Sequence, residues 1–387
     1  MFSSEFYIKN RAKLRKQVGD KNIVVVGNSL MQRTSEVTFP FRQNSDFLYL
    51  TGVTEPNSAL VINGKTGEEF IMVDAKIGIH KIFDGVYNPK EIASTSGISD
   101  IRTTLQGLSY ISQNSNQGVG INHGPLVRKV DFELNGYRAV IARKLKARGV
   151  KLEDARLSIV SQRMIKQPVE IVAIQKAIAL TKKALSEIEP LVQQAKNEND
   201  LSIELNVRFA RAGVEHAFSP LIQAGLNTTI LHYDKHNAPI ANNSVVLFDI
   251  GAEYQHYAAD ISRTYIKGTN ERAAKVIAAV QDVQKRLIAH VMPGRTWREL
   301  HEYSEQLTLE KLKELGVTDD PGLVRQYFPH AFGHFVGLDT HDAGDYTMPL
   351  QAGMVVTVEP GIYLPKEQIG VRIEDVILVT ETGAKVL

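Results

Sequence analysis

The segment Val245-Val-Leu-Phe-Asp249-Ile-Gly251 is a run of apolar residues that ends in a carboxylate, followed by one further apolar residue and a glycine. The same plan returns later in the chain, in Val355-Val-Thr-Val-Glu359-Pro-Gly361. Short runs rich in valine and bounded by turn residues predict buried strands. The echo therefore predicts two strands that each end in an acid, and two halves of the C-terminal part that share one plan.

Each of these strands is followed by another strand-like run that carries a further acid. Asp260 lies in the run 257–266, and Glu374 lies in the run 370–379. Antiparallel strands bring residues that are distant in sequence within a few ångström of one another. The four carboxylates can therefore converge, and a pair of divalent cations would offset their repulsion while taking their oxygens as ligands.

A histidine-rich segment offers ligands of a second kind. His330, His334 and His341 occur between Pro329 and Asp342, among glycines that let the backbone bend closely around a ligand. One of these imidazoles can complete the metal shell. The chain has no cysteine, so disulfides, thiolate-held zinc and a cysteine nucleophile are excluded, and any metal must sit on oxygen and nitrogen.

Each of these residues also has an ordinary structural interpretation when it is taken alone. Asp249 suits a turn, Glu359 can simply end a strand, and Glu374 can belong to a solvated sheet edge. His334 can be a core histidine with satisfied hydrogen bonds, and Arg372 a surface charge. Only their occurrence together in one chain favours a metal site over these separate explanations.

The length of 387 residues predicts two domains, each large enough to bury a core. In the front part, strands are expected at 23–27, 59–62 and 70–73, with an Asn63-Gly64 turn between the last two. Pro168 and Glu170 open a helix-like stretch with a regular apolar face. The domain boundary is therefore placed near residue 165, behind an α/β front domain.

The rear part alternates helix-like and strand-like runs. Helices are expected near 199–215, 271–291 and 297–315, and strands near 244–250, 257–266, 354–359 and 370–379. This mixture predicts an α+β domain in which helices pack on one antiparallel sheet.

Charge and hydropathy exclude several classes of partner. Lys and Arg number 45 against 43 Asp and Glu, a net charge of +2, which gives no electrostatic reason to bind nucleic acid or an anionic membrane. The N-terminus lacks a basic region followed by an apolar run, and no stretch of 18 apolar residues occurs. A cytoplasmic protein without nucleic-acid or membrane partners is expected.

Several stretches carry a resemblance to a known family that extends over nearly the whole chain. They are Pro40–Gly52, Ile230–Tyr233, Asp249–Gly251, Ala259–Thr264, His330–Asp342, Val358–Tyr363 and Gly370–Asp375. In these stretches the sequence resembles the aminopeptidase P and prolidase branch of the metallopeptidases that share the pita-bread fold. The resemblance implies an aminopeptidase P N-terminal domain over 1–165 and a pita-bread catalytic domain over 166–387. In a pita-bread domain, helices pack on a curved antiparallel sheet with internal pseudo-symmetry.

The same resemblance implies roles for individual residues. The five ligand positions for two divalent ions fall on Asp249, Asp260, His334, Glu359 and Glu374, with Asp260 and Glu374 bridging both ions. The positions around the substrate fall on His232, His330, His341 and Arg372. Ligands of this kind favour Mn²⁺, although Co²⁺, Fe²⁺ and Zn²⁺ also fit them.

The activity that the resemblance implies is the release of one N-terminal residue from short peptides with proline at the second position. A water shared by the two ions would attack as hydroxide, with Glu359 as general base and His232 and His341 donating to the oxyanion. A homodimer or homotetramer is expected. The alternatives are a prolidase that cleaves Xaa-Pro dipeptides and a non-catalytic module that binds peptides.

One stretch departs from the family pattern. Phe83-Asp84-Gly85-Val-Tyr87 stands where many relatives carry Trp-x-Gly-x-Arg, in a segment that often lines the pocket for the first substrate residue. The preferred first residue is therefore left open.

Overall fold

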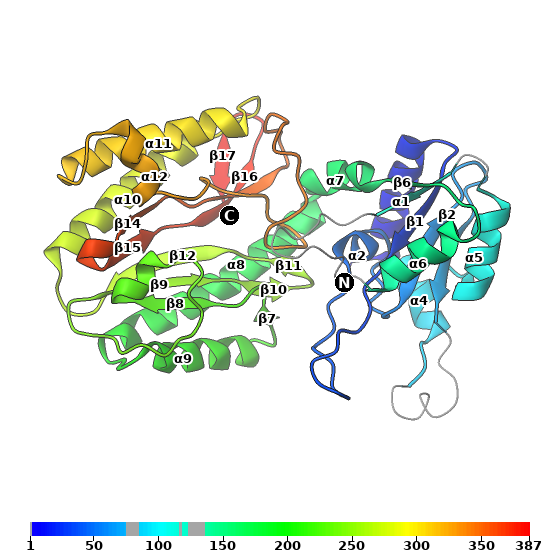
Figure 1. Cartoon of the computed structure of the whole chain (residues 1–387), viewed down its shortest axis with the longest axis horizontal. Helices are drawn as coiled ribbons and strands as arrows, with labels where there is room; N and C mark the ends of the chain where they lie inside the picture. Colours follow the sequence, from blue (N-terminus) through cyan, green and yellow to red (C-terminus); the bar gives the residue numbers. More distant parts are fainter. Residues whose placement is uncertain (1, 75–84, 116–117, 123–135) are drawn as a thin grey trace. The chain divides into compact units, whose positions relative to one another are not determined.

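The structure is a computed structural model that describes residues 2–74, 85–115, 118–122 and 136–387. The chain divides into two compact units, Met1–Gln162 and Arg163–Leu387 (Figure 1). Phe83 and Asp84 of the departing stretch lie outside the described residues. None of the described helices combines the length and the apolar character that a membrane span requires.

The front unit is built on a six-stranded sheet in the order β4-β3-β2-β1-β5-β6. Its strands are β1 (Asn22–Val26), β2 (Ser58–Ile62), β3 (Glu69–Val73), β4 (Ile101–Thr103), β5 (Val119–Ile121) and β6 (Leu152–Asp154). β1, β2 and β3 pair antiparallel, whereas β4, β5 and β6 pair parallel to their neighbours. The predicted hairpin is present, because Ile62 of β2 stands opposite Glu69 of β3.

Helices accompany this sheet, as the α/β prediction requires. They are α1 (Ser4–Val18), α2 (Ser45–Thr51), α4 (Pro89–Ser96), α5 (Thr104–Gln113), α6 (Gly136–Lys146) and α7 (Arg156–Met164), whose last two residues belong to the rear unit. The core joins β1, β2, β3 and β5 to α5 and α6 through buried side chains such as Val24, Phe70, Leu108 and Ile141. Apolar side chains from both layers thus hold the front unit together.

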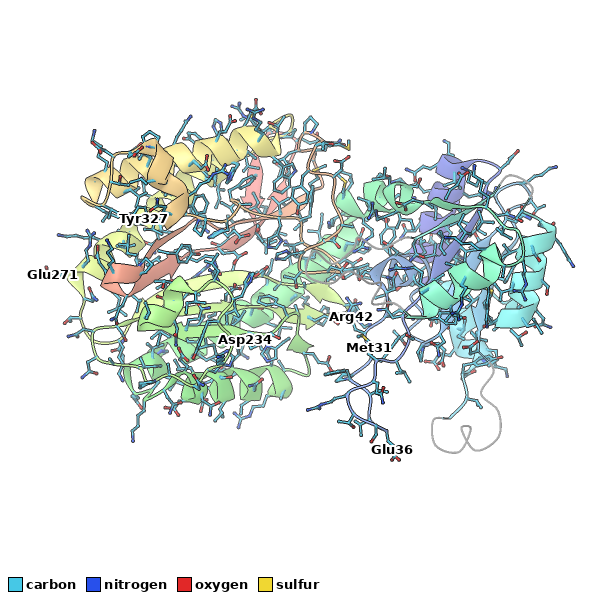
Figure 2. All side chains as sticks on the ribbon, in the orientation of Figure 1. Met31, Glu36, Arg42, Asp234, Glu271 and Tyr327 are labelled. Carbon is cyan, nitrogen blue, oxygen red and sulfur yellow. The ribbon has the colours of Figure 1, made fainter. Side chains whose placement is uncertain are left out.

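The stretch Pro40–Gly52 forms a capped helix. The Asn44 side chain accepts hydrogen bonds from the backbone N–H groups of Asp46 and Phe47, and Gly52 ends α2 in the left-handed conformation. Before this helix, a bridge between Gln32 and Thr38 closes a loop that carries Glu36 at its tip (Figure 2). The family-like motif therefore has a structural role in starting α2.

In the rear unit, the longest helix begins where the sequence predicts. α8 (Pro168–Ile188) has Pro168 in its first turn, and the Glu170 carboxylate accepts a hydrogen bond from the Gln167 backbone N–H at 2.9 Å. Ile174, Ile178 and Leu185 are buried on one face. The other helices are α9 (Glu198–Arg211), α10 (Glu271–His290), α11 (Trp297–Glu314) and α12 (Val324–Tyr327), with short 3₁₀ turns η1 (Glu189–Gln193), η2 (Gly225–Thr229), η3 (Pro321–Leu323) and η4 (Pro365–Glu367).

The strands of the rear unit form four antiparallel ladders, β11-β10-β7, β12-β9-β8, β13-β16-β17 and β14-β15. Their bounds are β7 (Glu215–His216), β8 (Leu221–Ala224), β9 (Val245–Ile250), β10 (Ala252–Tyr254), β11 (Tyr257–Ala258), β12 (Ile261–Ile266), β13 (Val355–Val358), β14 (Gly361–Leu364), β15 (Ile369–Arg372), β16 (Asp375–Val379) and β17 (Ala384–Val386). α8 packs on β10 and β11, α9 on β8, and α10 on β15. Helices on antiparallel strands are the predicted α+β arrangement.

Two predicted strands are interrupted in the structure. The run 257–266 breaks at Ala259 and Asp260, and the run 370–379 breaks at Ile373 and Glu374. At each break the chain leaves one ladder and enters another, so an acid stands between two short strands. The sequence pattern did not reveal these breaks, since Asp260 stands between Ala259 and Ile261, and apolar residues resume directly after Glu374 and Asp375.

Candidate metal centre and active site

The first pair of acids comes from β9 and β12. Asp249 lies on β9 directly opposite Ser262 of β12, and Asp260 immediately precedes β12. One oxygen of Asp249, Oδ2, accepts a hydrogen bond from Arg372 Nη2 at 2.7 Å. Its other oxygen, Oδ1, is buried without a hydrogen-bond partner among the described residues.

The second pair of acids comes from the junctions of β13 and β16. Glu359 follows β13 and Glu374 precedes β16, and the register of these strands places Val358 opposite Asp375. Ser262 joins this pair to the first one: its Oγ donates to Glu374 Oε2 at 2.7 Å, and its carbonyl accepts from the Glu374 N–H at 3.1 Å. The two halves echoed in the sequence therefore meet at their acids.

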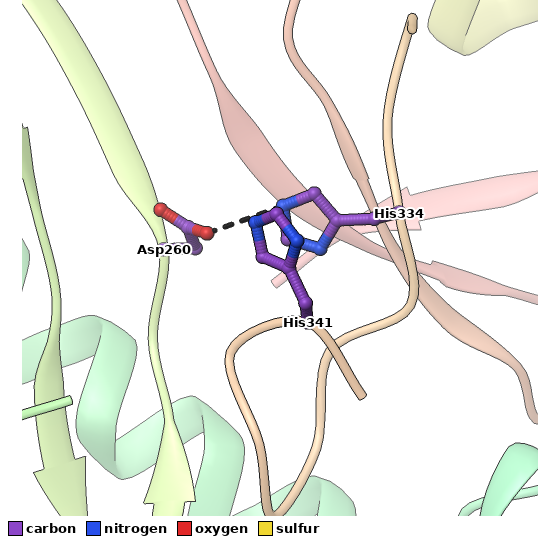
Figure 3. Close-up of side chains that lie close together, drawn as sticks. All are labelled: Asp260, His334 and His341. Atoms are coloured by element: carbon purple, nitrogen blue, oxygen red, sulfur yellow. Dashed lines mark ion pairs between the residues drawn. The ribbon is translucent and has the colours of Figure 1, made fainter. Parts of the chain in front are cut away.

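His334 enters the same place from the loop before β13. Its backbone is fixed by Thr357, which accepts from the His334 N–H at Oγ1 and donates its own N–H to the His334 carbonyl. The ring Nδ1 lies 3.0 Å from the Phe335 carbonyl, and Nε2 lies 3.3 Å from Asp260 Oδ2 (Figure 3). Since Nδ1 can only donate to a carbonyl, Nε2 is left with a lone pair that faces the acids.

Three overlapping groups have ligand atoms within 4.8 Å of one another, as the geometry of a metal site requires. They are Asp249 with Asp260 and Glu374; His334 with Glu359 and Glu374; and Asp260 with His334 and His341. All five residues assigned to metal positions from the sequence thus lie together, and Glu374 is common to two of the groups.

Burial makes these acids hard to ionise. Burial, followed by the charges of Asp249 and Glu359, raises the pKa of Asp260 well above its ordinary value. Burial and the charge of Asp260 do the same to Glu374, and burial also raises the pKa of Glu359. Like charges held close together in a low dielectric disfavour the ionised form.

The donor set fits divalent cations. The acids lie close together, the Asp249 Oδ1 atom lacks a partner among the described residues, and the His334 Nε2 lone pair faces the acids. Cations at this point would offset the repulsion and use the oxygens. Carboxylates with one imidazole are ligands suited to hard and borderline divalent ions.

Arg372 and His330 are connected by a residue to which sequence reasoning gave no role. Arg372 Nη1 donates to Tyr363 Oη at 2.9 Å, and Tyr363 Oη lies 2.9 Å from His330 Nε2. His330 Nδ1 lies 2.8 Å from the Ala331 carbonyl, so Nδ1 carries the proton and Nε2 accepts from the tyrosine hydroxyl. Burial lowers the pKa of His330 to about 3, which keeps this ring neutral.

Tyr363 and Ser262 are the residues that the sequence interpretation missed. Both lie inside motifs that carry the family resemblance, Val358–Tyr363 and Ala259–Thr264. Arg372 reaches both of them, because its Nε also donates to Ser262 Oγ at 2.9 Å. Their position within the motifs was the available signal, but neither residue type points to a metal site by itself.

His341 and His232 lie at the exposed side of this cluster. The His341 ring stacks on the His334 ring, with centroids 4.0 Å apart and an interplanar angle of 27°. Burial and the neighbouring His334 lower the pKa of His341 to about 4. His232 is exposed on the loop after η2, and after these larger causes its charge also lowers the pKa of His341. The structure therefore brings every predicted site residue into one region of the rear unit.

Residues 172–381 match the metallopeptidase family M24, and residues 7–118 match the aminopeptidase P N-terminal domain. This chain belongs to metallopeptidase family M24. Among curated relatives of this M24 chain, Xaa-Pro aminopeptidase 3 of Homo sapiens is 30% identical over 402 residues, covering 95% of the chain and 78% of that protein. The Xaa-Pro aminopeptidase of Haemophilus influenzae is 30% identical over 387 residues, covering 92% of the chain and 87% of that protein.

Solved structures show the same architecture for this M24 member. A putative aminopeptidase P from Bacillus anthracis superposes with a TM-score of 0.91 at 28% identity, covering 100% of this chain and 94% of that one. Aminopeptidase P from E. coli, at 24% identity and a TM-score of 0.88, shares the fold. The predicted aminopeptidase P resemblance and the α/β plus pita-bread fold class are confirmed.

Proposed function

We propose that this M24 metallopeptidase is an Xaa-Pro aminopeptidase, which releases the first residue of short peptides whose second residue is proline. The observation that carries the proposal is a set of three overlapping ligand groups, supplied by both halves of the rear unit; within each group the ligand atoms lie within 4.8 Å of one another. The names of the relatives that match nearly the whole chain support the substrate class. Residues 1–165 would serve as the N-terminal domain and 166–387 as the catalytic domain.

The ion-holding residues of this proposal are Asp249, Asp260, His334, Glu359 and Glu374. They offer oxygen and imidazole nitrogen only, which suits two Mn²⁺ ions and also admits Co²⁺, Fe²⁺ or Zn²⁺. Divalent cations bound there supply positive charge that offsets the acids, polarises a peptide carbonyl and makes a water acidic enough to attack at neutral pH. This chemistry is hydrolysis of the peptide bond before proline.

Glu359 is the residue that we assign as general base. Its side chain remains 16% exposed, whereas that of Asp260 is 6% exposed, so Glu359 is the better placed of the two to meet a water. Thr357 Oγ1 donates to Glu359 Oε1 at 3.2 Å, which orients the carboxylate. Glu359 would take the proton of the attacking water and return it to the proline nitrogen as the bond breaks.

His341 and His232 are the donors that we assign to the developing oxyanion. With a pKa lowered to about 4, His341 is neutral at physiological pH and carries one N–H that can donate. Donors aimed at a developing charge are each worth about 3 kcal/mol in comparable sites. His330 has both ring nitrogens engaged by Ala331 and Tyr363, so it and Arg372 orient the site.

A homodimer or homotetramer, the absence of nucleic-acid and membrane partners, and a cytoplasmic location stay predictions from the sequence. A small substrate panel tests the activity itself. Purified protein with Mn²⁺ is expected to release arginine from an Arg-Pro-Pro peptide, to lose this activity on extensive chelation and to regain it when Mn²⁺ is returned. Full activity after chelation would contradict the proposal.

The same panel separates the two alternatives. A prolidase would cleave Xaa-Pro dipeptides and leave Xaa-Pro-Xaa tripeptides intact, and a binding module would bind peptides without cleaving either. The proposed enzyme prefers the tripeptides.

A further inference from the structure

A second group of charged side chains is buried in the rear unit, outside the ligand groups. Asp342 follows His341, and its side chain is 1% exposed. Lys166 Nζ donates to Asp342 Oδ2 at 2.9 Å, and Arg163 Nη2 donates to Asp342 Oδ1. The side chains of Lys166 and Arg163 are 1% and 5% exposed. We call these three residues the ionic clamp.

The clamp shapes the loop that carries His341. Asp342 Oδ1 also accepts the backbone N–H of Asp339 at 3.2 Å, while the Asp342 N–H donates to the Phe335 carbonyl at 2.8 Å. Arg163 Nη2 further donates to Asp339 Oδ2 at 2.8 Å. The loop between Phe335 and Asp342 is thus closed by hydrogen bonds on both sides of His341.

The other end of the clamp is fixed to the framework of the unit. The Lys166 N–H donates to the Gly353 carbonyl at 2.8 Å, and Ile165 forms a bridge with Met354 just before β13. Gly337 gives the clamp its room, because a Cβ there would lie 2.3 Å from Asp342 Oδ2 and 3.0 Å from Lys166 Cε. The loop, the clamp and the strand before Glu359 therefore form one connected body.

Stability alone is a poor explanation for this arrangement. Three buried charges lose their hydration, and their replacement by apolar side chains of similar size is often neutral or stabilising. The hydrogen bonds from Arg163 and Lys166 to Asp342 are directional, however, so they fix the position of the Asp342 side chain and of the backbone that carries it. Here they hold the residue next to His341, whose ring stacks at 4.0 Å on His334 (Figure 3).

We propose that Asp342, held between Arg163 and Lys166, is a positioning residue that fixes the His341 ring against His334 at the substrate side of the site. The inference rests on the proposed function, in which His341 contacts the substrate. Asp342 does not touch the substrate or the ions; it acts through its chain neighbour. An ordered donor is worth far more to the transition state than a mobile one, and a displacement of about 1 Å can cost about 100-fold in rate.

A double-mutant cycle tests the proposal. Asp342→Asn keeps the shape of the side chain and removes its charge, and it is expected to lower kcat on an Xaa-Pro tripeptide about 10- to 100-fold. In a His341→Ala background the same change is expected to alter kcat less than about twofold, since the group it positions is gone. The loss in melting temperature should be the same in both backgrounds. An equal fall in kcat in both backgrounds would overturn the proposal.

Two further variants keep the test decisive. If Asp342→Asn does not fold, Lys166→Met takes its place in the double-mutant cycle, because it removes one of the two basic side chains that hold Asp342. Asp282→Asn is the control, because it breaks an ion pair with Lys311 between α10 and α11 and is expected to leave kcat unchanged. Loss of kcat in this control would show that any lost ion pair has the same effect, and would also contradict the proposal.

A readout without turnover separates this proposal from the proposed function. In protein loaded with Zn²⁺ and labelled at histidine, the His341 ring resonances are expected to shift and broaden in Asp342→Asn but not in Asp282→Asn. Unchanged His341 resonances would overturn the clamp even in an active enzyme. If the wild-type protein cleaves no Xaa-Pro peptide but the His341 resonances still shift in Asp342→Asn, only the proposed function is contradicted.

Discussion

Two groups of buried carboxylates lie in the rear unit, and they differ in where their neutralising charge comes from. Burial alone would raise the pKa of Asp342, but the charges of Arg163 and Lys166 lower it below its ordinary value. Asp260 and Glu374 are also buried, yet burial and their acidic neighbours raise the pKa of each well above its ordinary value. The charge of Asp342 is neutralised by basic side chains of the same chain, whereas Asp260 and Glu374 need positive charge from bound ions.

This difference separates a structural cluster from a site of chemistry. A buried acid that is bonded to basic side chains fixes the fold around it, while buried acids that face one another are poised to bind cations. Arg372 lies at the border between the two cases, because it neutralises part of Asp249 but reaches no oxygen of Asp260 among its described hydrogen bonds. The metal centre is therefore marked by its unbalanced charge as much as by its residue types.

The largest effect is expected from a change within the unbalanced group. Glu359→Gln keeps the size of the side chain, so the fold and at least one bound ion should persist, but a neutral amide cannot take the proton from water. Turnover of an Xaa-Pro tripeptide should fall about 10²- to 10⁴-fold. Steady-state kinetics together with metal analysis would check this, and near-normal turnover would remove Glu359 from the role of base.

A change beside the clamp, at Gly337, should instead affect stability. Gly337→Ala places a Cβ 2.3 Å from Asp342 Oδ2. The Asp342 carboxylate cannot move away freely, because the buried side chains of Arg163 and Lys166 hold it. The free energy of unfolding should fall by about 1–3 kcal/mol, as for other overpacked sites. Denaturant unfolding measures this. Gly136→Ala is the control, since a Cβ at Gly136 meets nothing within 4 Å and the backbone there does not adopt a positive φ.

The smallest effect is expected in the pH dependence of stability. Asp260 and Glu374 on one side and Asp342 on the other should change the free energy of unfolding in opposite directions as the pH rises. The raised pKa values of Asp260 and Glu374 give a stabilising contribution that is complete below the unfolded carboxyl pKa of about 4. It is lost as the pH rises through the folded values. The lowered pKa of Asp342 gives a contribution that is present above the unfolded value and is lost as the pH falls through the folded one.

Chelated protein is therefore expected to gain thermal stability as the pH falls from about 8 to about 5, because Asp260 and Glu374 take up protons while the clamp stays ionised. The double variant Asp260→Asn/Glu374→Gln should show a smaller gain, to which the raised pKa values of Glu359 and of the buried Glu170 still contribute. Melting temperatures measured across this pH range in chelator provide the comparison. The same pH slope in both proteins would contradict the assignment of unbalanced charge to these two acids.

The two groups also differ in how far the sequence could reveal them. Three acids of the metal centre stand out, because Asp249, Asp260 and Glu359 each lie within or after an apolar run, where a carboxylate is unusual. Glu374, between Ile373 and Asp375, gives no such signal. The echo of Val245–Gly251 in Val355–Gly361 then paired them, and the family resemblance supplied their roles, which stay predictions. The antiparallel ladders place them together, as strand pairing does for distant residues.

The clamp left no such signal. Arg163 and Lys166 occur in a charged segment before Pro168, and nothing local distinguishes a buried lysine from a solvated one. Asp342, their partner, comes 176 or more positions later, so only the folded chain connects them. The breaks at Asp260 and Glu374 were missed for a related reason, because ladder pairing is decided by partners far away in sequence.

The central claim is that buried acids of the rear unit coexist because divalent cations neutralise them. Metal analysis after equilibration with Mn²⁺ tests it most directly, in wild-type protein and in the double variant Asp260→Asn/Glu374→Gln. The account predicts about two ions per wild-type chain, as in two-metal hydrolases, and almost none in the folded variant. The same ion content in both proteins would contradict it.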